Sequence, residues 1–400
     1  MTALSEILSG RKVIACVGSG GVGKTTTAAT LALRAAVEGK RALVLTIDPA
    51  RRLANSLGLE KLGNRETQID LSPLRAIGVA PKGALWAMML DQKLAWDDLV
   101  QRDARSESQA KTILENRLYK TLSTVLAGSL EYMAMERVYE FWKSQKYDVV
   151  VLDTPPTSNA LDFLSAPDRL MDFLDNDAMR LVLGPMLKAG KVGLKLFALP
   201  SSIVLKTLAR FTGADFLRDV ADFLIAFEGM YDAFKARAAA VKAMLASKDA
   251  GFVLVTSPNA LTIDEAVFFH ETLKSERIAT QAVVVNRVQR DPHRFGGASE
   301  QAPIAEALQQ AQIADAARAV DGVQAAAVFG EQEAQIAREP LSVRLAQTLH
   351  EQSTLADVDK RQIERLRLTL GQVPLFAVPR LRKDVHDLSG LWQIDEHLRG

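Results

Sequence analysis

One short stretch constrains the fold of this chain more than any other. An apolar run at residues 13–17 leads directly into a glycine-rich segment at residues 18–25, which matches the pattern G-x-x-x-x-G-K-[ST]. The apolar run predicts a buried strand, and the glycines permit a sharp turn into a following helix. Backbone N–H groups in such a loop converge on phosphate oxygens. The sequence therefore predicts a strand, a phosphate-binding loop and a helix, in that order.

The residues of this loop suit the phosphates of a nucleotide together with a magnesium ion. Lys24 supplies a positive charge for the β- and γ-phosphates, and the Thr25 hydroxyl can bind Mg²⁺. Nucleotide contacts are expected from Gly20, Gly21, Val22, Gly23, Lys24, Thr25 and Thr26. The guanine-reading pattern Asn-Lys-x-Asp is absent, because Asn286, at the end of a later apolar run, is followed by Arg287. ATP is therefore the expected nucleotide, with Mg²⁺.

The composition excludes several other classes of protein. A chain of 400 residues with 48% hydrophobic residues can bury one large core or two ordinary ones, so it is neither disordered nor a small disulfide-stapled domain. The formal net charge of +1 gives no overall field that would attract nucleic acid. Cys16 is the single cysteine, which is typical of a reducing compartment. Without a secretory signal or an uncharged apolar stretch of about 18 residues, a cytoplasmic location is expected.

Strand and helix patterns alternate along the chain. Strands are predicted at residues 13–17, 41–47, 75–80, 149–153, 251–255, 281–285 and 373–378. Helices are predicted at residues 25–38 and through most of residues 84–147. Core contacts in that second helical region are expected from Trp86, Met89, Leu94, Trp96 and Leu99. Six or seven strands separated by helices predict an α/β fold with a doubly wound, mainly parallel sheet of P-loop NTPase type.

Two stretches interrupt this alternation and suggest a domain organisation. Residues 158–246 lack a strand pattern and are expected to form a helical insert. The insert separates a first part of the ATPase core, residues 1–157, from a second part, residues 247–400, which contains a helical stretch at residues 299–371. Within the insert an apolar seam repeats at alternating spacings of four and three residues, at Phe216, Val220, Phe223, Phe227, Met230 and Phe234.

The insert is also strongly apolar at residues 171–211, and two interpretations stay open for it. The segment forms either the core of the insert or a hydrophobic groove for a partner. Lys195, Pro200 and Lys206 interrupt its most apolar part, which argues against a membrane span. Of the two interpretations we favour the core.

Polar side chains that end three of the predicted strands suit nucleotide chemistry. The carboxyl ends of parallel strands meet at one edge of a sheet, where ligands bind, and Asp48 and Asp153 lie at such ends. Asp153 can support Mg²⁺ together with Thr25, and Asp48 can polarise a water for attack on the γ-phosphate unless it only opens a turn. Asn286 fits either recognition of the base by its amide or ordinary turn chemistry.

Together these motifs resemble those of the ArsA-like ATPases, which include the arsenite-pump ATPase and the ATPase that delivers tail-anchored membrane proteins. The resemblance rests on the phosphate loop, on Asp48-Pro49-Ala50 as a first switch and on residues 153–157 as a second switch. It implies that Asp48 is the water-activating carboxylate and that the insert binds partners. It also implies that Asp153 contacts the direct ligands of Mg²⁺ rather than the ion itself.

The resemblance also covers the part of the site that contacts adenine. Asn286, Pro379 within residues 378–381, and residues 384–388 are similar to the adenine-contacting elements of the family. These elements follow the family's order through the chain, from residue 12 to about residue 392. The resemblance therefore implies an adenine site built from three separate segments.

Two departures from the family pattern bear on function. Family members usually carry a lysine at the position of Ser19, and that lysine reaches the partner's nucleotide across a dimer. Its absence implies slow hydrolysis in a homodimer, completion of the site by Arg51 or Arg52, or a heterodimer in which a related ATPase supplies the lysine. The family's zinc-binding or arsenite-binding cysteines are also missing, since residues 290–302 hold none, so no zinc or arsenite site is expected.

The sequence therefore favours a slow, Mg²⁺-dependent ATPase that acts as a dimeric, nucleotide-driven switch. Its partner could be a hydrophobic client, a lipid-linked molecule or a soluble or membrane-associated protein, and no nucleic acid is indicated. The alternative is an ATP-binding regulatory scaffold or heterodimer subunit with little hydrolysis of its own, which Ser19 keeps open. A metabolic phosphotransferase is less favoured, because the insert offers apolar rather than polar groups.

Overall fold

An eight-stranded sheet forms the centre of the computed structural model, which describes residues 3–48, 52–125, 129–155, 214–292, 341–381 and 383–399. The strand order is β3-β4-β2-β5-β1-β6-β7-β8. All pairings are parallel except that of the short β3, which runs antiparallel to β4. The strands are β1 (Val13–Val17), β2 (Arg41–Thr46), β3 (Thr67–Gln68), β4 (Ala84–Met89), β5 (Val149–Asp153), β6 (Ala250–Thr256), β7 (Thr280–Val288) and β8 (Leu375–Pro379). The predicted fold class is confirmed.

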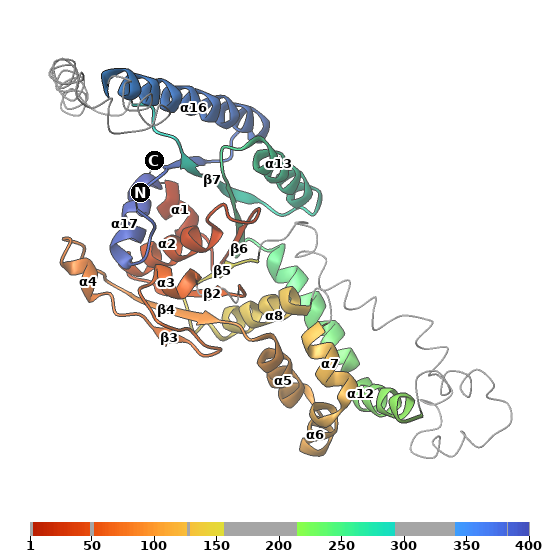
Figure 1. Cartoon of the computed structure of the whole chain (residues 1–400). Helices are drawn as coiled ribbons and strands as arrows, with labels where there is room; N and C mark the ends of the chain where they lie inside the picture. Colours follow the sequence, from red (N-terminus) through yellow and green to blue (C-terminus); the bar gives the residue numbers. More distant parts are fainter. Residues whose placement is uncertain are drawn as a thin grey trace, which may run out of the picture.

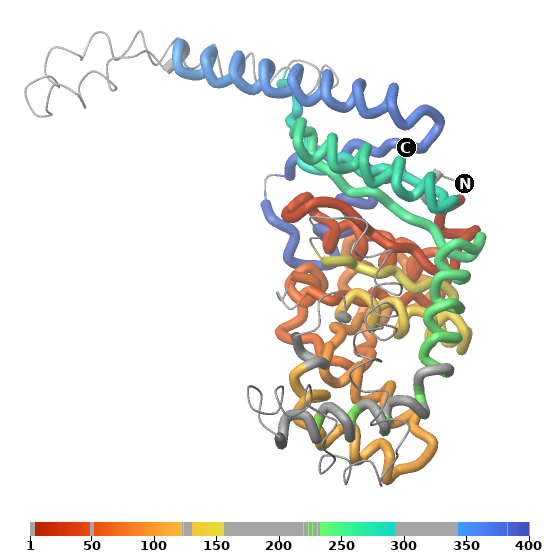
Figure 2. Tube along the Cα trace, turned by 90° about the vertical axis from the view of Figure 1, so that its right-hand side faces the viewer, coloured from red at the N-terminus to blue at the C-terminus, as the bar shows by residue number. Residues whose placement is uncertain are grey.

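Helices cover both faces of the sheet (Figure 1). One layer consists of α1 (Ala3–Ser9), α2 (Lys24–Val37), α3 (Arg52–Ser56), α4 (Ser72–Arg75) and α17 (Leu388–His397). The other consists of α5 (Gln92–Asp103), α6 (Glu107–Glu115), α7 (Arg117–Val125), α8 (Ser129–Ser144), α12 (Ala214–Leu245), α13 (Ala260–Ser275) and α16 (Leu341–Leu370). Figure 2 shows α16 extending beyond the body of the molecule.

Strand β1 explains why the sheet needs two helical layers. Val13, Ala15 and Val17 belong to the core on one face, whereas Ile14 and Cys16 belong to the core on the other. All five residues are buried, as expected for a central parallel strand whose side chains alternate between two covered faces. The predicted strand is confirmed. Burial also raises the pKa of the Cys16 thiol, which is consistent with a cysteine that only fills space.

The predictions for residues 75–99 were partly wrong. Residues 75–80 are not a strand: Arg75 ends the short helix α4, and the chain then turns at Gly78, whose φ is 82°. The strand is instead β4, in a region predicted to be helical, because parallel pairing with β2 and antiparallel pairing with β3 decide its conformation. Leu94 is 48% exposed and is not a core residue, whereas Trp96 and Leu99 are buried as predicted.

Part of the apolar seam of the predicted insert is core. Helix α12 packs against α6, α7 and α8, and its residues Phe223, Met230 and Phe234 are buried. The Phe234 ring stacks on Trp96 with centroids 6.1 Å apart. The other members of the seam, at positions 216, 220 and 227, and the whole of residues 171–211 lie outside the described side chains. The boundaries of the insert therefore stay a prediction.

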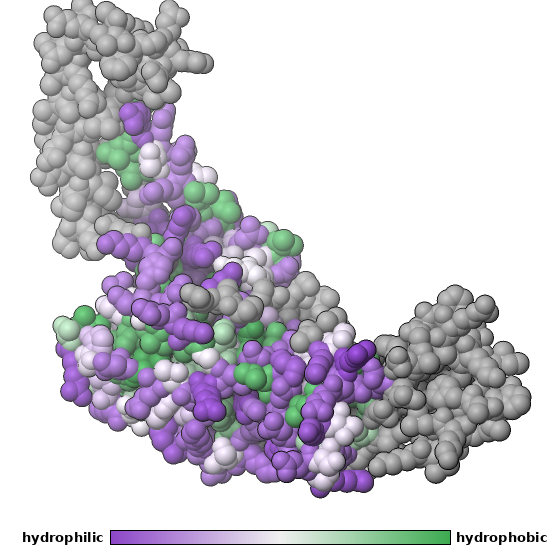
Figure 3. All heavy atoms as spheres, turned by 60° about the horizontal axis from the view of Figure 1, so that its bottom comes forward, coloured by the Kyte–Doolittle hydropathy of each residue, from purple (hydrophilic) through white to green (hydrophobic). Residues whose placement is uncertain are grey.

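Figure 3 shows a mainly hydrophilic surface with smaller hydrophobic areas between the charged residues. The large hydrophobic side chains that are most exposed include Leu261 and Phe268 on α13 and Leu368 on α16. Among the described helices, none has both the length and the apolar character that crossing a membrane requires.

A buried carboxylate fastens the last helix to the helix that follows the phosphate loop. Asp395 of α17 is fully buried and lies 2.9 Å from Arg34 of α2 and 3.1 Å from Arg399. The same two guanidinium groups also lie over the Trp392 ring, at 5.6 Å and 4.9 Å from its centroid. Because α17 also supplies Ile394 to the pocket described below, this contact positions part of the site.

Replacing Asp395 by alanine should lower the free energy of unfolding by about 2 kcal/mol, because the buried contact loses the acceptor of the Arg34 hydrogen bond and gains a cavity. Chemical denaturation at neutral pH measures this change. Arg399→Gln is the matched control, since Arg399 is 37% exposed and its loss should cost less than about 1 kcal/mol. Equal losses of unfolding free energy in the two variants would contradict the role of Asp395 as the buried partner of Arg34.

Candidate functional site

The phosphate loop lies between β1 and α2, and three of its glycines have positive φ. Gly18, Gly21 and Gly23 have φ values of 150°, 76° and 102°. A Cβ on Gly23 would also lie 2.2 Å from Asn286 Nδ2, so only glycine fits there. Gly23 is the N-cap of α2 and provides no side-chain cap, which leaves N–H groups of the first helical turn available to phosphate.

Lys24 and Thr25 open α2 at the base of this loop. Lys24 is only 6% exposed, and its ammonium donates a hydrogen bond of 2.7 Å to the Ser19 carbonyl oxygen. Burial lowers the pKa of Lys24, while the nearby carboxylates of Asp153 and Asp48 oppose that shift. Burial disfavours the positive charge of Lys24, and phosphate oxygens would supply the negative charge that stabilises it. The lysine is therefore placed for an anion.

Asp153 ends β5 beside the loop and suits the magnesium ion that such a loop uses. Its carboxylate is fully buried, and Oδ2 accepts a hydrogen bond of 2.8 Å from the Thr46 hydroxyl. Its Oδ1 atom is buried without a hydrogen-bond partner. Burial raises the pKa of Asp153 to about 6, against the opposing effects of Thr25, Thr46 and Lys24. A buried carboxylate oxygen without a partner beside a threonine hydroxyl fits a hydrated Mg²⁺.

A hydrogen-bonded link joins Asp48 to Asp153. The Thr46 hydroxyl accepts a hydrogen bond of 3.2 Å from the Asp48 N–H while it donates to Asp153. The Asp48 carboxylate is 14% exposed and lies 3.6 Å from the Arg52 guanidinium. The structure therefore brings together the two carboxylates predicted from sequence. Pro49, Ala50 and Arg51 lie outside the described residues.

Thr46 is a site residue that sequence reasoning missed. It is the last residue of β2, and its register partner on β5 is Asp153. The only sequence signal is its position two residues before Asp48, which places both side chains on the same face of an extended segment. A threonine at a strand end is too common for that signal to be specific.

A cavity of about 550 Å³ adjoins the loop on the side of β7 and β8. Its lining includes Gly23, Thr26, Asn286, Arg287, Gln289, Pro379, Arg380, Leu381, Lys383, Asp384, Val385 and Ile394. It therefore brings together the three separate segments that the sequence resemblance suggested for adenine. A volume of this size, open to the phosphate loop, suits a nucleoside.

Asn286 connects this cavity to the phosphate loop. Its amide Nδ2 donates a hydrogen bond of 2.9 Å to the Val22 carbonyl, and its Oδ1 accepts one of 2.9 Å from the Arg287 N–H. Arg287 has a φ of 61°, an unusual conformation for a residue with a side chain. Asn286 thus supports the loop directly, while its role toward a base stays a prediction.

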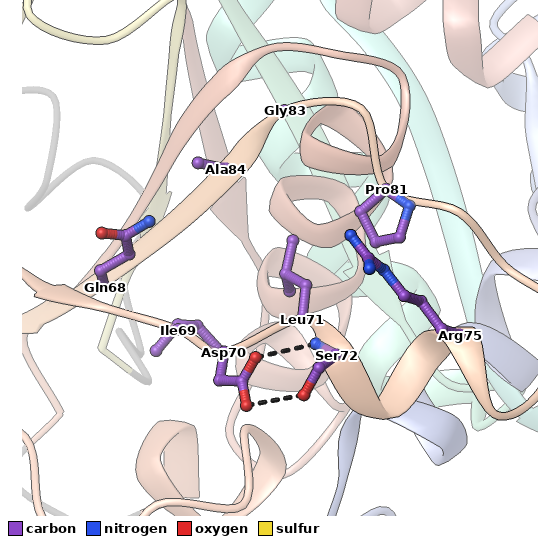
Figure 4. Close-up of a pocket in the computed structure, with 9 residues that line it drawn as sticks. All are labelled: Gln68, Ile69, Asp70, Leu71, Ser72, Arg75, Pro81, Gly83 and Ala84. Atoms are coloured by element: carbon purple, nitrogen blue, oxygen red, sulfur yellow. Dashed lines mark hydrogen bonds between the residues drawn. The ribbon is translucent and has the colours of Figure 1, made fainter.

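A second pocket does not share these properties. It has a volume of about 470 Å³ and lies at the amino end of β4, beside Gly83 and Ala84 (Figure 4). Since the strands run parallel, this is the opposite edge of the sheet from the phosphate loop, which follows the carboxyl end of β1. The carboxylate in the lining of this pocket, Asp70, accepts hydrogen bonds from the Ser72 N–H and hydroxyl, at 2.9 Å and 2.7 Å. The phosphate loop and its neighbouring cavity are therefore the stronger candidate.

The loop, the two linked carboxylates and the adjoining cavity define a protein of the P-loop nucleotide-binding class. A family model described as anion-transporting ATPase matches residues 11–314 of the chain. The chain belongs to this family, the ArsA ATPases, and the family predicted from the motifs is confirmed.

Several curated proteins are similar to the chain. The ATPase GET3B of Arabidopsis thaliana is 27% identical over 313 residues, which cover 72% of this chain and 67% of that protein. The ATPase get3 of Aspergillus terreus is 32% identical over 174 residues, or 43% of this chain and 48% of that protein. A putative arsenical pump-driving ATPase of Prosthecochloris vibrioformis is 35% identical over 159 residues, which cover 40% of this chain and 36% of that protein. The match thus spans about half of the Aspergillus relative.

Proposed function

We propose that this chain is a Mg²⁺-dependent ATPase that acts as a nucleotide-driven switch and binds and releases a hydrophobic or protein partner. The observation that carries the proposal is the link from Asp48 through Thr46 to Asp153, beside the buried ammonium of Lys24. In this proposal Asp48 is the carboxylate for water, Asp153 the carboxylate for a metal ion and Lys24 the cation for phosphate, all near one edge of the sheet. These are the groups that phosphoryl transfer to water requires.

Each residue has a definite task in this scheme. Lys24 leaves the Ser19 carbonyl and binds the β- and γ-phosphates, while N–H groups of the loop and first helical turn hold the remaining oxygens. Thr25 and an ionised Asp153 would hold Mg²⁺, which neutralises charge on the phosphates when bound. Asp48 orients a water for in-line attack and accepts its proton. Asn286, Pro379 and the rest of the 550 Å³ cavity receive the adenosine.

The same contacts support a switch. The γ-phosphate would order the segments that follow Asp48 and Asp153, and hydrolysis would release them. The second of these segments leads into residues 158–246, the proposed partner-binding insert. We propose that the chain works in the cytoplasm as a dimer, either with a second copy or with a related ATPase that supplies the lysine missing at Ser19.

The alternative function is an ATP-binding regulatory subunit with little hydrolysis of its own. Ser19 favours it, because its uncharged side chain cannot supply the positive charge of the absent lysine and bonds to Glu265 instead. Of the two candidate substitutes predicted from sequence, Arg52 lies beside Asp48, and Arg51 lies outside the described residues. Both functions require ATP binding and differ in turnover.

Nucleotide binding tests what the two functions share. We expect Lys24→Ala to weaken Mg²⁺·ATP binding by about 10- to 100-fold, because the replacement removes a charge-assisted contact to phosphate in a buried site. Titration of the purified chain with a fluorescent ATP analogue measures the affinity. Lys12→Ala is the control, since Lys12 pairs with Asp249 at the far end of β1. Unchanged affinity in the Lys24 variant would refute the nucleotide site.

A further inference from the structure

A carboxylate from α13 holds the residue at which this chain departs from its family. The Ser19 hydroxyl donates a hydrogen bond to Glu265 of α13. Helix α13 follows β6, and the end of β6 packs closely on the loop, since a Cβ on Gly18 would lie 2.0 Å from the Val255 carbonyl oxygen. The close approach of β6 thus brings α13 beside the tip of the loop.

Ser19 lies at the end of the loop where the terminal phosphates of a nucleotide bind. The Lys24 ammonium, which contacts β- and γ-phosphates in loops of this pattern, lies 2.7 Å from the Ser19 carbonyl oxygen. The same residue therefore bonds to Lys24 through its carbonyl and to Glu265 through its hydroxyl. This arrangement puts the Glu265 carboxylate close to the expected position of the γ-phosphate.

The charge of Glu265 is not neutralised by the described part of the chain. Its neighbour Asp264 forms an ion pair with Arg365 of α16. Among the described residues, however, no basic side chain lies within 4.0 Å of the Glu265 carboxylate, and Glu265 is exposed. A carboxylate beside a phosphate site repels the bound anion, and the repulsion is larger for ATP than for ADP because ATP carries the additional γ-phosphate.

We propose that Glu265 is a specificity-determining residue of the nucleotide site. In the nucleotide-free protein it holds the tip of the phosphate loop through Ser19. When ATP binds, repulsion by the γ-phosphate breaks the Ser19–Glu265 hydrogen bond, and the energy of breaking it reduces the preference for ATP over ADP. Glu265 thereby distinguishes the two nucleotides in the isolated chain. This inference rests on the proposed nucleotide site.

Glu265→Gln tests the charge while keeping an acceptor for the Ser19 hydroxyl. At low salt we expect the variant to bind ATP about three- to tenfold more tightly than the wild type, with the affinity for ADP changing less than about twofold. In about 0.5 M salt the difference should fall below about twofold, because salt screens exposed charges. Titrations with fluorescent ATP and ADP analogues at both salt concentrations give all four dissociation constants.

Glu271→Gln is the matched control, since Glu271 is an exposed carboxylate on the same helix without a hydrogen bond to the loop, and it should leave the ratio of ATP to ADP affinity unchanged. An unchanged ratio in Glu265→Gln would overturn the inference. Equal changes for ATP and ADP would also overturn it, because they would indicate only a structural contact. A wild-type chain that binds neither nucleotide would instead refute the proposed function.

Discussion

Replacing Asp48 by asparagine should reduce ATP turnover about 100-fold and leave ATP binding within about threefold of the wild type. Asparagine keeps the size of the side chain and the backbone N–H that bonds to Thr46, but it cannot accept a proton from water. Because Asp48 lies at the end of β2 and the phosphate contacts come from the loop and α2, the loss should fall on the chemical step rather than on binding.

Single-turnover measurement of phosphate release, with a separate binding titration, distinguishes these two effects. Asp70→Asn is a suitable control, because Asp70 is an exposed carboxylate in the pocket at the opposite edge of the sheet. A turnover rate of the wild type above that of the Asp48 variant would support the ATPase function. Equally low rates in both proteins, with ATP binding intact, would favour the regulatory scaffold, and Ser19 would then be its sequence signature.

The fold could be predicted where local patterns are strong. The central strands β1, β5, β6 and β7 each contain a buried apolar run of four or more residues, as expected for strands covered on both faces of a parallel sheet. Near the edge of the sheet the same reasoning failed. β4 is also an apolar run, but its Ala, Leu and Met residues favour helix, so the run could not be distinguished from a buried helical segment by its pattern.

The candidate site divides in a similar way. Lys24, Thr25, Asp48 and Asp153 could be identified because each belongs to a short motif whose residues have recognised chemical roles. Thr46 and Glu265 could not, because their contacts join residues 107 and 246 positions apart in the chain. Only the order of the strands, with β1 between β5 and β6, shows which distant side chains meet the loop. Sequence patterns thus identify the groups with chemical roles, and the topology identifies the groups that support them.

Asp153→Asn should have opposite effects on stability and on activity. The pKa of Asp153 is raised from its ordinary value of 3.8 to about 6 by burial. The protonated carboxyl therefore stabilises the nucleotide-free fold at low pH, and this contribution is lost as the pH rises from about 4 through 6. Two pKa units correspond to about 3 kcal/mol at most, so the ionised, buried carboxylate makes the free protein less stable at neutral pH.

Asparagine removes that charge and still accepts a hydrogen bond from Thr46, although its buried amide lacks a new partner. We therefore expect the free energy of unfolding of nucleotide-free Asp153→Asn to exceed that of the wild type by about 1–2 kcal/mol at pH 7.5, with the difference vanishing near pH 5. Turnover should fall about 10- to 100-fold, because a support for Mg²⁺ is lost.

Thermal unfolding from pH 5 to pH 8, with and without Mg²⁺·ATP, measures both effects. Asp148→Asn provides a control of opposite sign, because hydrogen bonding to Arg41 lowers the pKa of Asp148, and its replacement should not raise the melting temperature. A melting temperature of Asp153→Asn below that of the wild type at pH 8 would contradict the argument. In the nucleotide-free protein the ionised Asp153 lowers stability, and bound Mg²⁺ would supply the positive charge that relieves this effect. The relief would then form part of the stabilisation that Mg²⁺·ATP provides.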